Sequence, residues 1–214
     1  MTETCPTSDA QQYWESFYQD QDPVWSGRPN PLLVREVTAL TPGTALDLGC
    51  GEGADAIWLA RQGWRVTAVD VSATVLERAA AYAVEAGIVD GIRWAKHDLS
   101  QSFPDGFFDL VSVQFFHSPV ASAGEREKTL RRAAEAVAPA GLLLIVGHAG
   151  WPSWLHSPPT NVHLPTTAEV LDSLGLDLGR WRVELQEVVE HELLGPEGRR
   201  GRRQDNVLRV RRTR

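Results

Sequence analysis

The amino-acid sequence predicts an α/β protein built on a seven-stranded, mostly parallel sheet with a C-terminal antiparallel hairpin. Three observations lead to this prediction. Short apolar segments alternate with helical segments over residues 44–146, a glycine-rich turn joins the first strand to its helix, and two β-rich stretches close the chain. Strands that alternate with helices form βαβ units, which build a parallel sheet covered on both faces.

Residues 1–40 are predicted to form a helical lid outside this sheet. A short amphipathic helix is expected over residues 9–20, because its aromatic residues recur at helical spacing. The proline- and glycine-rich residues 22–31 cannot continue that helix. A second short helix is expected over residues 32–40.

Residues 41–150 alternate between strand and helix signals. Each expected strand is short and largely apolar or β-branched, and glycine or proline follows several of the helices. The expected strands are residues 44–48, 65–69, 92–96, 108–114 and 142–146, and the expected helices are residues 54–62, 73–85 and 125–137. This order predicts a parallel five-stranded core.

After residue 150 the alternation stops. Residues 151–214 begin with a loop rich in tryptophan, proline and histidine, followed by a short helix over residues 167–174. Two β-rich stretches, residues 181–190 and 206–211, then predict a hairpin. Its turn contains Gly195, Pro196 and Gly198. We expect this part to supply an acceptor loop and the closing hairpin.

The composition fits one domain. A chain of 214 residues has room for one well-packed core, and no linker divides it, so we expect a single domain over residues 1–214. The net charge of -7 disfavours a surface that binds nucleic acid. Eight arginines between Arg199 and Arg214 are the exception. Several alternate with apolar residues, which favours the solvent face of a last strand over a nucleic-acid patch.

Cysteine usage and hydropathy indicate the compartment. Cys5 and Cys50 are far apart, and Cys50 lies between two glycines, which disfavours a disulfide and fits a reducing environment. No charged N-terminal segment precedes an apolar stretch, and no apolar run reaches membrane-spanning length. We expect a cytoplasmic protein with no membrane partner. Monomer and homodimer both stay open.

The strongest functional signal is the segment ALDLGCGEG at residues 45–53, between a strand and a helix. Glycine lets the backbone turn sharply and approach a ligand closely. Amide groups at the following helix start are free to meet polar groups. The spacing G-x-G-x-G differs from the G-x-G-x-x-G that holds a dinucleotide pyrophosphate.

Two acidic residues refine this signal. Asp47 stands just before the turn, where it disfavours a phosphate and suits a cationic ligand. Asp70 ends the second expected strand, about twenty residues after the turn, where a carboxylate can accept both ribose hydroxyls. Together the two acids predict an adenosine that carries a positively charged amino-acid tail.

With these residues the sequence resembles the class I S-adenosylmethionine (SAM)-dependent methyltransferases, from about residue 25 to the C-terminus. LDLGCGEG is similar to the family's first motif, and Asp70 matches its ribose-binding acid. The resemblance implies a Rossmann-like class I methyltransferase fold. It also implies SAM as the cofactor, with S-adenosylhomocysteine (SAH) as the product.

The resemblance and the fold together give the expected cofactor site. Val71 matches the residue that lines the adenine, and Asp98 matches the acid that accepts from the adenine amino group. Trp25 and Arg28 lie on the lid loop, where an aromatic face can attract the sulfonium and an arginine can pair the donor's carboxylate. Loop anchoring is the alternative for both. The expected cofactor-binding residues are Trp25, Arg28, Asp47, Gly49, Cys50, Gly51, Gly53, Asp70, Val71, Asp98, Leu99 and Gln114.

Within that family the sequence looks most like the small bacterial tellurite-resistance and thiopurine-type methyltransferases. The similarity lies in the Tyr-Trp-Glu opening, the Pro-Val-Trp-Ser-Gly loop and the Pro-Glu-Gly turn of the hairpin. The tellurite enzymes carry a His-Arg pair near that turn, whereas this chain has a displaced His191 followed by Glu192. The tellurite substrate is therefore not carried over.

The acceptor is expected to bind beyond the carboxyl ends of the strands, where ligands lie in such sheets. His117 follows the fourth strand and is the best candidate for a general base, with a pocket-wall role as the alternative. The aromatic loop after the fifth strand suggests a cover for a flat or apolar acceptor. Its histidines lack the spacing of a metal site, so no metal is expected. The loop contains His148, Trp151, Trp154, His156 and His163.

The predicted activity is methyl transfer from SAM to a small-molecule thiol or chalcogen, hydroxyl or amine. The sequence lacks the Asn/Asp-Pro-Pro-aromatic motif of nucleic-acid amino methylases and the paired cysteines of base-carbon methylation. Two alternatives stay open: a SAM-binding protein without transfer activity, and a nicotinamide-dependent oxidoreductase, which Asp47 and the glycine spacing disfavour.

Overall fold

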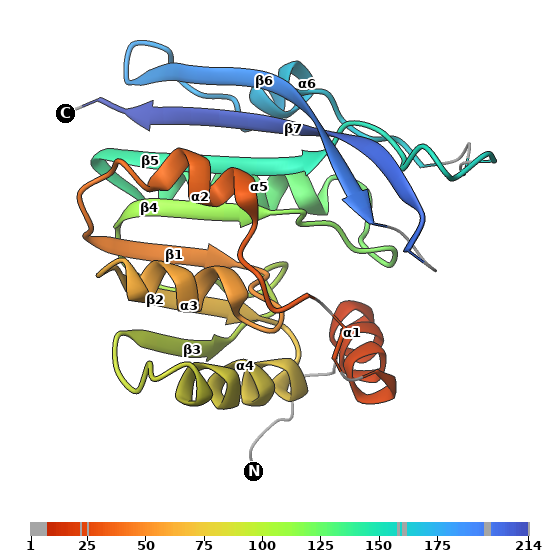
Figure 1. Cartoon of the computed structure of the whole chain (residues 1–214). Helices are drawn as coiled ribbons and strands as arrows, with labels where there is room; N and C mark the ends of the chain where they lie inside the picture. Colours follow the sequence, from red (N-terminus) through yellow and green to blue (C-terminus); the bar gives the residue numbers. More distant parts are fainter. Residues whose placement is uncertain are drawn as a thin grey trace.

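A computed structural model (Figure 1) describes residues 8–213 except 22, 25, 158, 160, 161 and 195–197. The strands are β1 (Thr44–Leu48), β2 (Arg65–Asp70), β3 (Ile92–Lys96), β4 (Phe108–Gln114), β5 (Val137–His148), β6 (Trp181–Leu194) and β7 (Arg200–Arg212). The helices are α1 (Asp9–Asp20), α2 (Pro31–Val37), α3 (Ala54–Arg61), α4 (Ala73–Glu85), α5 (Glu125–Glu135) and α6 (Thr167–Leu174).

The strands form one seven-stranded sheet in the order β3-β2-β1-β4-β5-β7-β6. Strands β1 to β5 run parallel, and Leu46 in β1 pairs with Thr67 in β2 and Val111 in β4. β7 pairs antiparallel with both β5 and β6. The predicted fold class, a mostly parallel Rossmann-like sheet with a closing hairpin, is confirmed.

Alternation along the strands fills both faces of the sheet. Leu143 packs with buried residues of α5 and α6 on one face, whereas its neighbours Leu142 and Leu144 pack with α2 and α3 on the other (Figure 1). All three leucines are buried, as expected for a strand covered on both faces. The functional groups are therefore left at the strand ends.

A large boundary difference is at β5, which begins at Val137 and not at residue 142. Val137 pairs with Phe108, but the next pair joins Leu142 to Leu110, so β5 bulges between them. Within the bulge Ala140 has a φ of 65°. An added Cβ on Gly141 would lie 2.8 Å from the Ala138 carbonyl oxygen, so only glycine fits there. Pro139 and Gly141, which the sequence suggests as the stop of the preceding helix, thus lie inside a bulged strand.

Apart from the hairpin, the other boundary differences are smaller. The expected bounds of α1, α4, α6, β1, β3 and β4 agree with the structure, whereas α2, α3 and α5 end before the residues expected. The hairpin is longer than expected, because pairing continues to Leu194 opposite Arg200. The expected turn residues Gly195 and Pro196 lie outside the described residues.

Several arginines of β7 take part in ion pairs. Arg209 lies 2.8 Å from Glu36, and Arg211 lies 2.6 Å from Glu184.

No helix among the described residues is both long and apolar enough to cross a membrane.

α1 lies beyond the carboxyl ends of the parallel strands, as Figure 1 shows. The Glu15 carboxylate accepts hydrogen bonds from the Ser72 hydroxyl (2.8 Å) and the Ala73 amide (2.9 Å) at the start of α4. Burial would raise the pKa of Glu15, but these bonds and one from Thr74 outweigh it and hold the pKa below its ordinary value. The negative charge of Glu15 is favourable at the N-terminus of α4, and this interaction holds α1 over the strand ends.

Candidate active site

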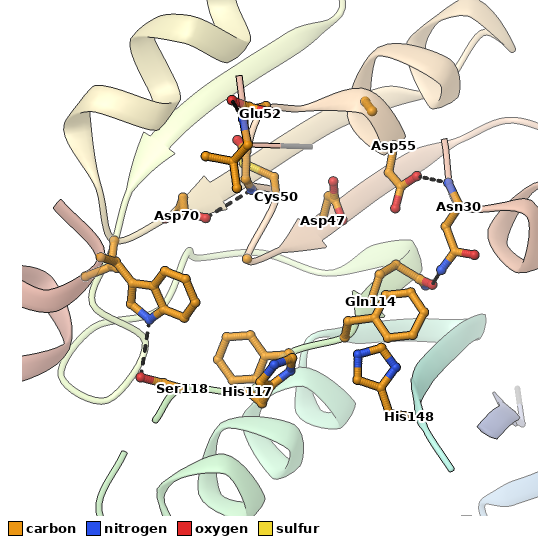
Figure 2. A pocket seen from close by; sticks show the side chains of 18 of the residues that line it. Asn30, Asp47, Cys50, Glu52, Asp55, Asp70, Gln114, His117, Ser118 and His148 are labelled. Carbon is orange, nitrogen blue, oxygen red and sulfur yellow. Dashed lines mark hydrogen bonds between the residues drawn. The ribbon is translucent and has the colours of Figure 1, made fainter. Parts of the chain in front are cut away.

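A cavity of about 1110 Å³ opens at the carboxyl ends of the parallel strands. Its lining includes residues of α1 and the following loop, of the segment after β3, and of the other six strands. Two opposite parts of its lining differ in chemistry (Figure 2). We call Asp47, Asp55 and Asp70 the carboxylate wall. We call Phe115, His117 and His148 the histidine wall.

The glycine turn after β1 is hydrogen-bonded to β2, and its residues border the cavity. The amides of Gly49 and Cys50 both donate to the Val69 carbonyl, at 2.8 and 2.9 Å. Gly49 and Gly51 have φ values of 70° and 52°, a left-handed conformation that glycine adopts without strain. Gly49, Cys50 and Gly51 all line the cavity, where the prediction placed the cofactor.

Gly53 has a different position from the other glycines of the motif. Its φ is 80°, and an added Cβ would lie 2.6 Å from the Trp94 ring and 2.9 Å from the Ala79 methyl group. Gly53 therefore allows α3 to start close against its neighbours. Its expected role in cofactor binding stays a prediction, and the position gives it a packing role.

Asp70 is held at the end of β2 by backbone amides. Its carboxylate accepts from Gly51 (3.0 Å) and Ser72 (3.1 Å), and the side chain is buried. Burial raises the pKa of Asp70, and these amide bonds offset only part of the rise. The bonds fix the carboxylate in the cavity lining, where Val71 follows it.

Asp47 is the most isolated carboxylate of the site. It is 2% exposed, and among the described residues its Oδ2 atom has no hydrogen-bond partner. Burial raises its pKa well above the usual range, and the nearby charges of Asp55 and Asp70 raise it further. Burial likewise raises the pKa of Asp55 to about 6. Three carboxylates packed this closely favour a cation between them.

The lid loop and β4 are tied to this wall through Asn30. Its amide N–H donates to Asp55 (2.6 Å), and its side-chain nitrogen donates to the Gln114 side-chain oxygen (2.7 Å). The side-chain oxygen of Asn30 also accepts from Leu32 and caps α2. Gln114, an expected cofactor contact, is thereby held at the end of β4 in the cavity lining.

The remaining expected residues lie at the edges of the cavity. Asp98 and Leu99 line it after β3, and the Asp98 carboxylate accepts from the Ser100 amide at 3.0 Å. Burial would raise the pKa of Asp98, but its hydrogen bonds outweigh this and lower it. Arg28 lines the cavity from an exposed position, and Trp25 lies outside the described residues.

Cys50 is unsuited to act as a nucleophile. Burial raises the pKa of its thiol well above the ordinary value, and the charges of Asp70 and Asp47 add to the rise. The thiol therefore stays protonated at neutral pH, and a thiolate is the reactive form.

The histidine wall is built at the ends of β4 and β5. Phe115 has a φ of 50°, an uncommon conformation for an aromatic residue, and its ring stacks on His148 at 4.5 Å. The His117 ring lies 5.7 Å from that of His148. Burial lowers the pKa of His117, and the neighbouring His148 lowers it further, so His117 is neutral at pH 7. Both histidines face the cavity in Figure 2.

A buried carboxylate on β7 supports this wall. Asp205 is 0% exposed and lies 3.0 Å from His148 Nδ1 and 3.1 Å from His191 Nε2. Arg203 donates to both of its oxygens at 2.9 Å. Burial would raise the pKa of Asp205, but the bonds from His148 and Arg203 outweigh it and lower the pKa. The carboxylate therefore stays ionised.

α1 closes one side of the cavity. The Trp14 indole donates to the Ser118 hydroxyl at 3.2 Å, which links α1 to the loop after β4. Trp14 and Tyr18 both line the cavity. Trp14 and Tyr18 of α1 thus form part of the site.

Several site residues were not predicted as such. Asn30 lies just before the second expected helix, and Asp55 lies just after the glycine motif. An acid so close to the motif was an available signal for Asp55. Arg203 and Asp205 carried no local signal, because their role depends on pairing with distant strands. Among the described residues no group of three histidine, cysteine or acidic side chains has the arrangement of a metal site.

Residues 45–141 match the family described as "Methyltransferase domain". A 2-heptyl-1-hydroxyquinolin-4(1H)-one methyltransferase from Mycobacteroides abscessus is 28% identical over 166 residues, which cover 71% of this chain and 71% of that protein. A ubiquinone biosynthesis O-methyltransferase from Caulobacter sp. is 38% identical over 100 residues, but the match covers only 47% of this chain and 38% of that protein.

The fold has relatives among solved structures. The N-methyltransferase NodS from Bradyrhizobium japonicum, in complex with SAH, superposes with a TM-score of 0.68 at 19% identity, covering 96% of this chain and all (100%) of that one. The chain therefore has the class I SAM-dependent methyltransferase fold, and residues 45–141 are similar to a methyltransferase domain. The matches do not single out the tellurite-resistance or thiopurine type that the sequence suggested.

Proposed function

We propose that the protein transfers a methyl group from SAM to a small-molecule acceptor by in-line displacement. One observation carries the proposal: within the carboxylate wall, the Oδ2 atom of the buried Asp47 carboxylate has no hydrogen-bond partner among the described residues. A buried acceptor without a partner is costly, and the ammonium group of a methionine tail would satisfy it. A dinucleotide pyrophosphate would be repelled, so the nicotinamide alternative is not favoured.

The other expected contacts fit the same donor. Asp70 would accept from the ribose hydroxyls, Val71 and Leu99 would line the adenine, and Asp98 would accept from its amino group. Arg28 and Gln114 would hold the methionine portion. When bound, SAM supplies an already activated methyl group. The chain's own residues orient the two reactants and exclude water.

The acceptor belongs on the histidine wall, opposite the donor. Pockets for small molecules hold about 300–1000 Å³, and the cavity here is slightly larger at about 1110 Å³. It therefore has room for a donor and an acceptor together. The relatives named as a 2-heptyl-1-hydroxyquinolin-4(1H)-one methyltransferase and as a ubiquinone biosynthesis O-methyltransferase support a small-molecule acceptor.

The test is SAH formation by the purified protein with SAM and a panel of hydroxyl, thiol and amine acceptors. Turnover that an acceptor stimulates, and that the Asp70→Ala variant lacks, would support the proposal. Tight SAM binding without turnover on any acceptor would favour a non-catalytic SAM-binding protein instead.

A further inference from the structure

The Asp205 cluster is more elaborate than a cavity wall requires. Four polar side chains converge there from three strands: His148 from β5, His191 from β6, and Arg203 and Asp205 from β7. The sheet register creates this arrangement, because His148 lies directly opposite Asp205 and His191 lies directly opposite Arg203. All four residues line the same cavity as the carboxylate wall.

His148 is fixed in orientation from two sides. Its Nδ1 lies 3.0 Å from Asp205, so the ionised carboxylate places the ring proton on Nδ1. Its ring face stacks on Phe115 at 4.5 Å with an interplanar angle of 29°. In the neutral ring of this tautomer, Nε2 carries the lone pair. His117 differs, since none of the described carboxylates lies within ion-pair distance of it.

The charges of the cluster favour a neutral acceptor over an anionic one. Arg203 gives both its Nε and Nη2 donors to Asp205, and its guanidinium lies 5.3 Å from the Phe115 ring centroid. Its charge is therefore balanced by Asp205, and the bidentate edge formed by its Nε and Nη2 is already occupied and not offered to an acceptor carboxylate or phosphate. Phe115 and Trp14 line the same cavity and contribute flat, apolar rings to it, which suits an aromatic acceptor.

We propose that His148, positioned by Asp205, is the base that removes the proton of an aromatic hydroxyl acceptor. This inference rests on the proposed function. In the step, the acceptor oxygen forms a bond to the methyl carbon as the carbon–sulfur bond breaks, and the electron pair of that bond returns to sulfur to give SAH. The hydroxyl proton passes to His148 Nε2 and afterwards to solvent. Asp205 stabilises the resulting imidazolium and does not take the proton.

The experiment compares His148→Gln, His117→Gln and Asp205→Asn with wild type, using 2-heptyl-1-hydroxyquinolin-4(1H)-one and thiophenol as acceptors. The thiol ionises readily in water and needs little help from a base. His148→Gln should lower kcat for the hydroxyl acceptor about 100-fold, with KM and SAH affinity within about twofold of wild type. For thiophenol the loss should be at most about fivefold. Asp205→Asn should follow His148→Gln in this pattern, with a smaller loss.

Control variants and measurements separate the possible outcomes. His163→Gln changes an exposed histidine paired with Glu169, outside the cavity lining, and should keep wild-type kinetics. Thermal melts and SAH titrations check that each variant is folded. Equal losses on the hydroxyl and the thiol, or a full loss in His117→Gln alone, would overturn the role of His148. SAH binding without methylation of the hydroxyl probe or of a set of phenols would overturn the acceptor class. Absence of SAH binding by wild type would instead contradict the proposed function.

Discussion

The two walls of the cavity are built in different ways. The carboxylate wall comes from residues 47–70, a single βαβ unit, and backbone amides hold two of its acids, Asp55 and Asp70. The histidine wall takes residues from the ends of β4 and β5, and its support comes from β6 and β7. The donor side thus depends on local structure, whereas the acceptor side depends on strand register. Substitutions should therefore separate donor binding from turnover.

The largest expected effect is on the carboxylate wall. Asp70→Ala should weaken SAH binding at least about 100-fold, because it removes a fixed, buried acceptor for the ribose hydroxyls. Calorimetric titration measures this. Asp90→Ala, an exposed acid in the loop before β3, is the matched control and should bind SAH normally. Unchanged SAH affinity in Asp70→Ala would show that the donor site is wrongly assigned.

Gly53→Ala should affect the fold of the same region. The new Cβ would lie 2.6 Å from the Trp94 ring at a residue whose φ is 80°. Overpacking and a strained φ together should lower the free energy of unfolding by about 2–3 kcal/mol, measured by urea denaturation. Gly87→Ala also has a positive φ, but no atom lies within 4 Å of its added Cβ, so it should cost less. Equal losses in both variants would assign the effect to φ alone.

Asp55→Asn should change how stability depends on pH. The folded pKa of about 6 lies above the ordinary value of 3.8, so Asp55 stabilises the fold in its neutral form. That contribution is complete below about pH 4 and is lost as pH rises through 6. The ligand-free variant should therefore be more stable than wild type at pH 7, by about 1–2 kcal/mol. At pH 4.5 this difference in the free energy of unfolding should be smaller.

The same substitution should weaken donor binding. SAM affinity of wild type should increase from pH 5 to pH 7, because a cationic tail binds the ionised carboxylates. Asp55→Asn should reduce that increase. Calorimetry at the two pH values, together with urea denaturation, tests both parts. A variant that is no more stable than wild type at pH 7 would contradict the raised pKa.

The smallest effect is expected at His117. His117→Ala should leave SAH affinity within about twofold of wild type and lower kcat less than about tenfold, because the residue lines the acceptor side without an orienting carboxylate. Steady-state kinetics with the acceptor found in the panel measures this. A loss of SAH binding would mean that the two walls are not separable.

The two walls also differ in how far the sequence predicts them. Asp47 and Asp70 were predicted because a strand, a glycine turn and an acid at the next strand end are all close in sequence. The cluster of His148, Asp205 and Arg203 was not predicted, since it depends on the antiparallel register of β5 with β7. His191 was interpreted as a histidine that lacks its arginine, yet Arg203 lies directly opposite it across the hairpin.

The same distinction applies to the fold. Helices with a local start and stop signal, such as α4 between Ser72 and Gly87, had the expected bounds. β5 did not, because Pro139 and Gly141 end a helix in most local contexts but here form a bulge against β4. Long-range pairing overrides the local signal at such positions.

The central claim is that the carboxylate wall binds the donor SAM, and calorimetric titration with SAM, SAH and NAD tests it most directly. We predict binding of SAM and SAH with a Kd on the order of micromolar, about -8 kcal/mol, and no detectable binding of NAD. Binding of NAD in preference to SAM, or no binding of SAM, would contradict the account.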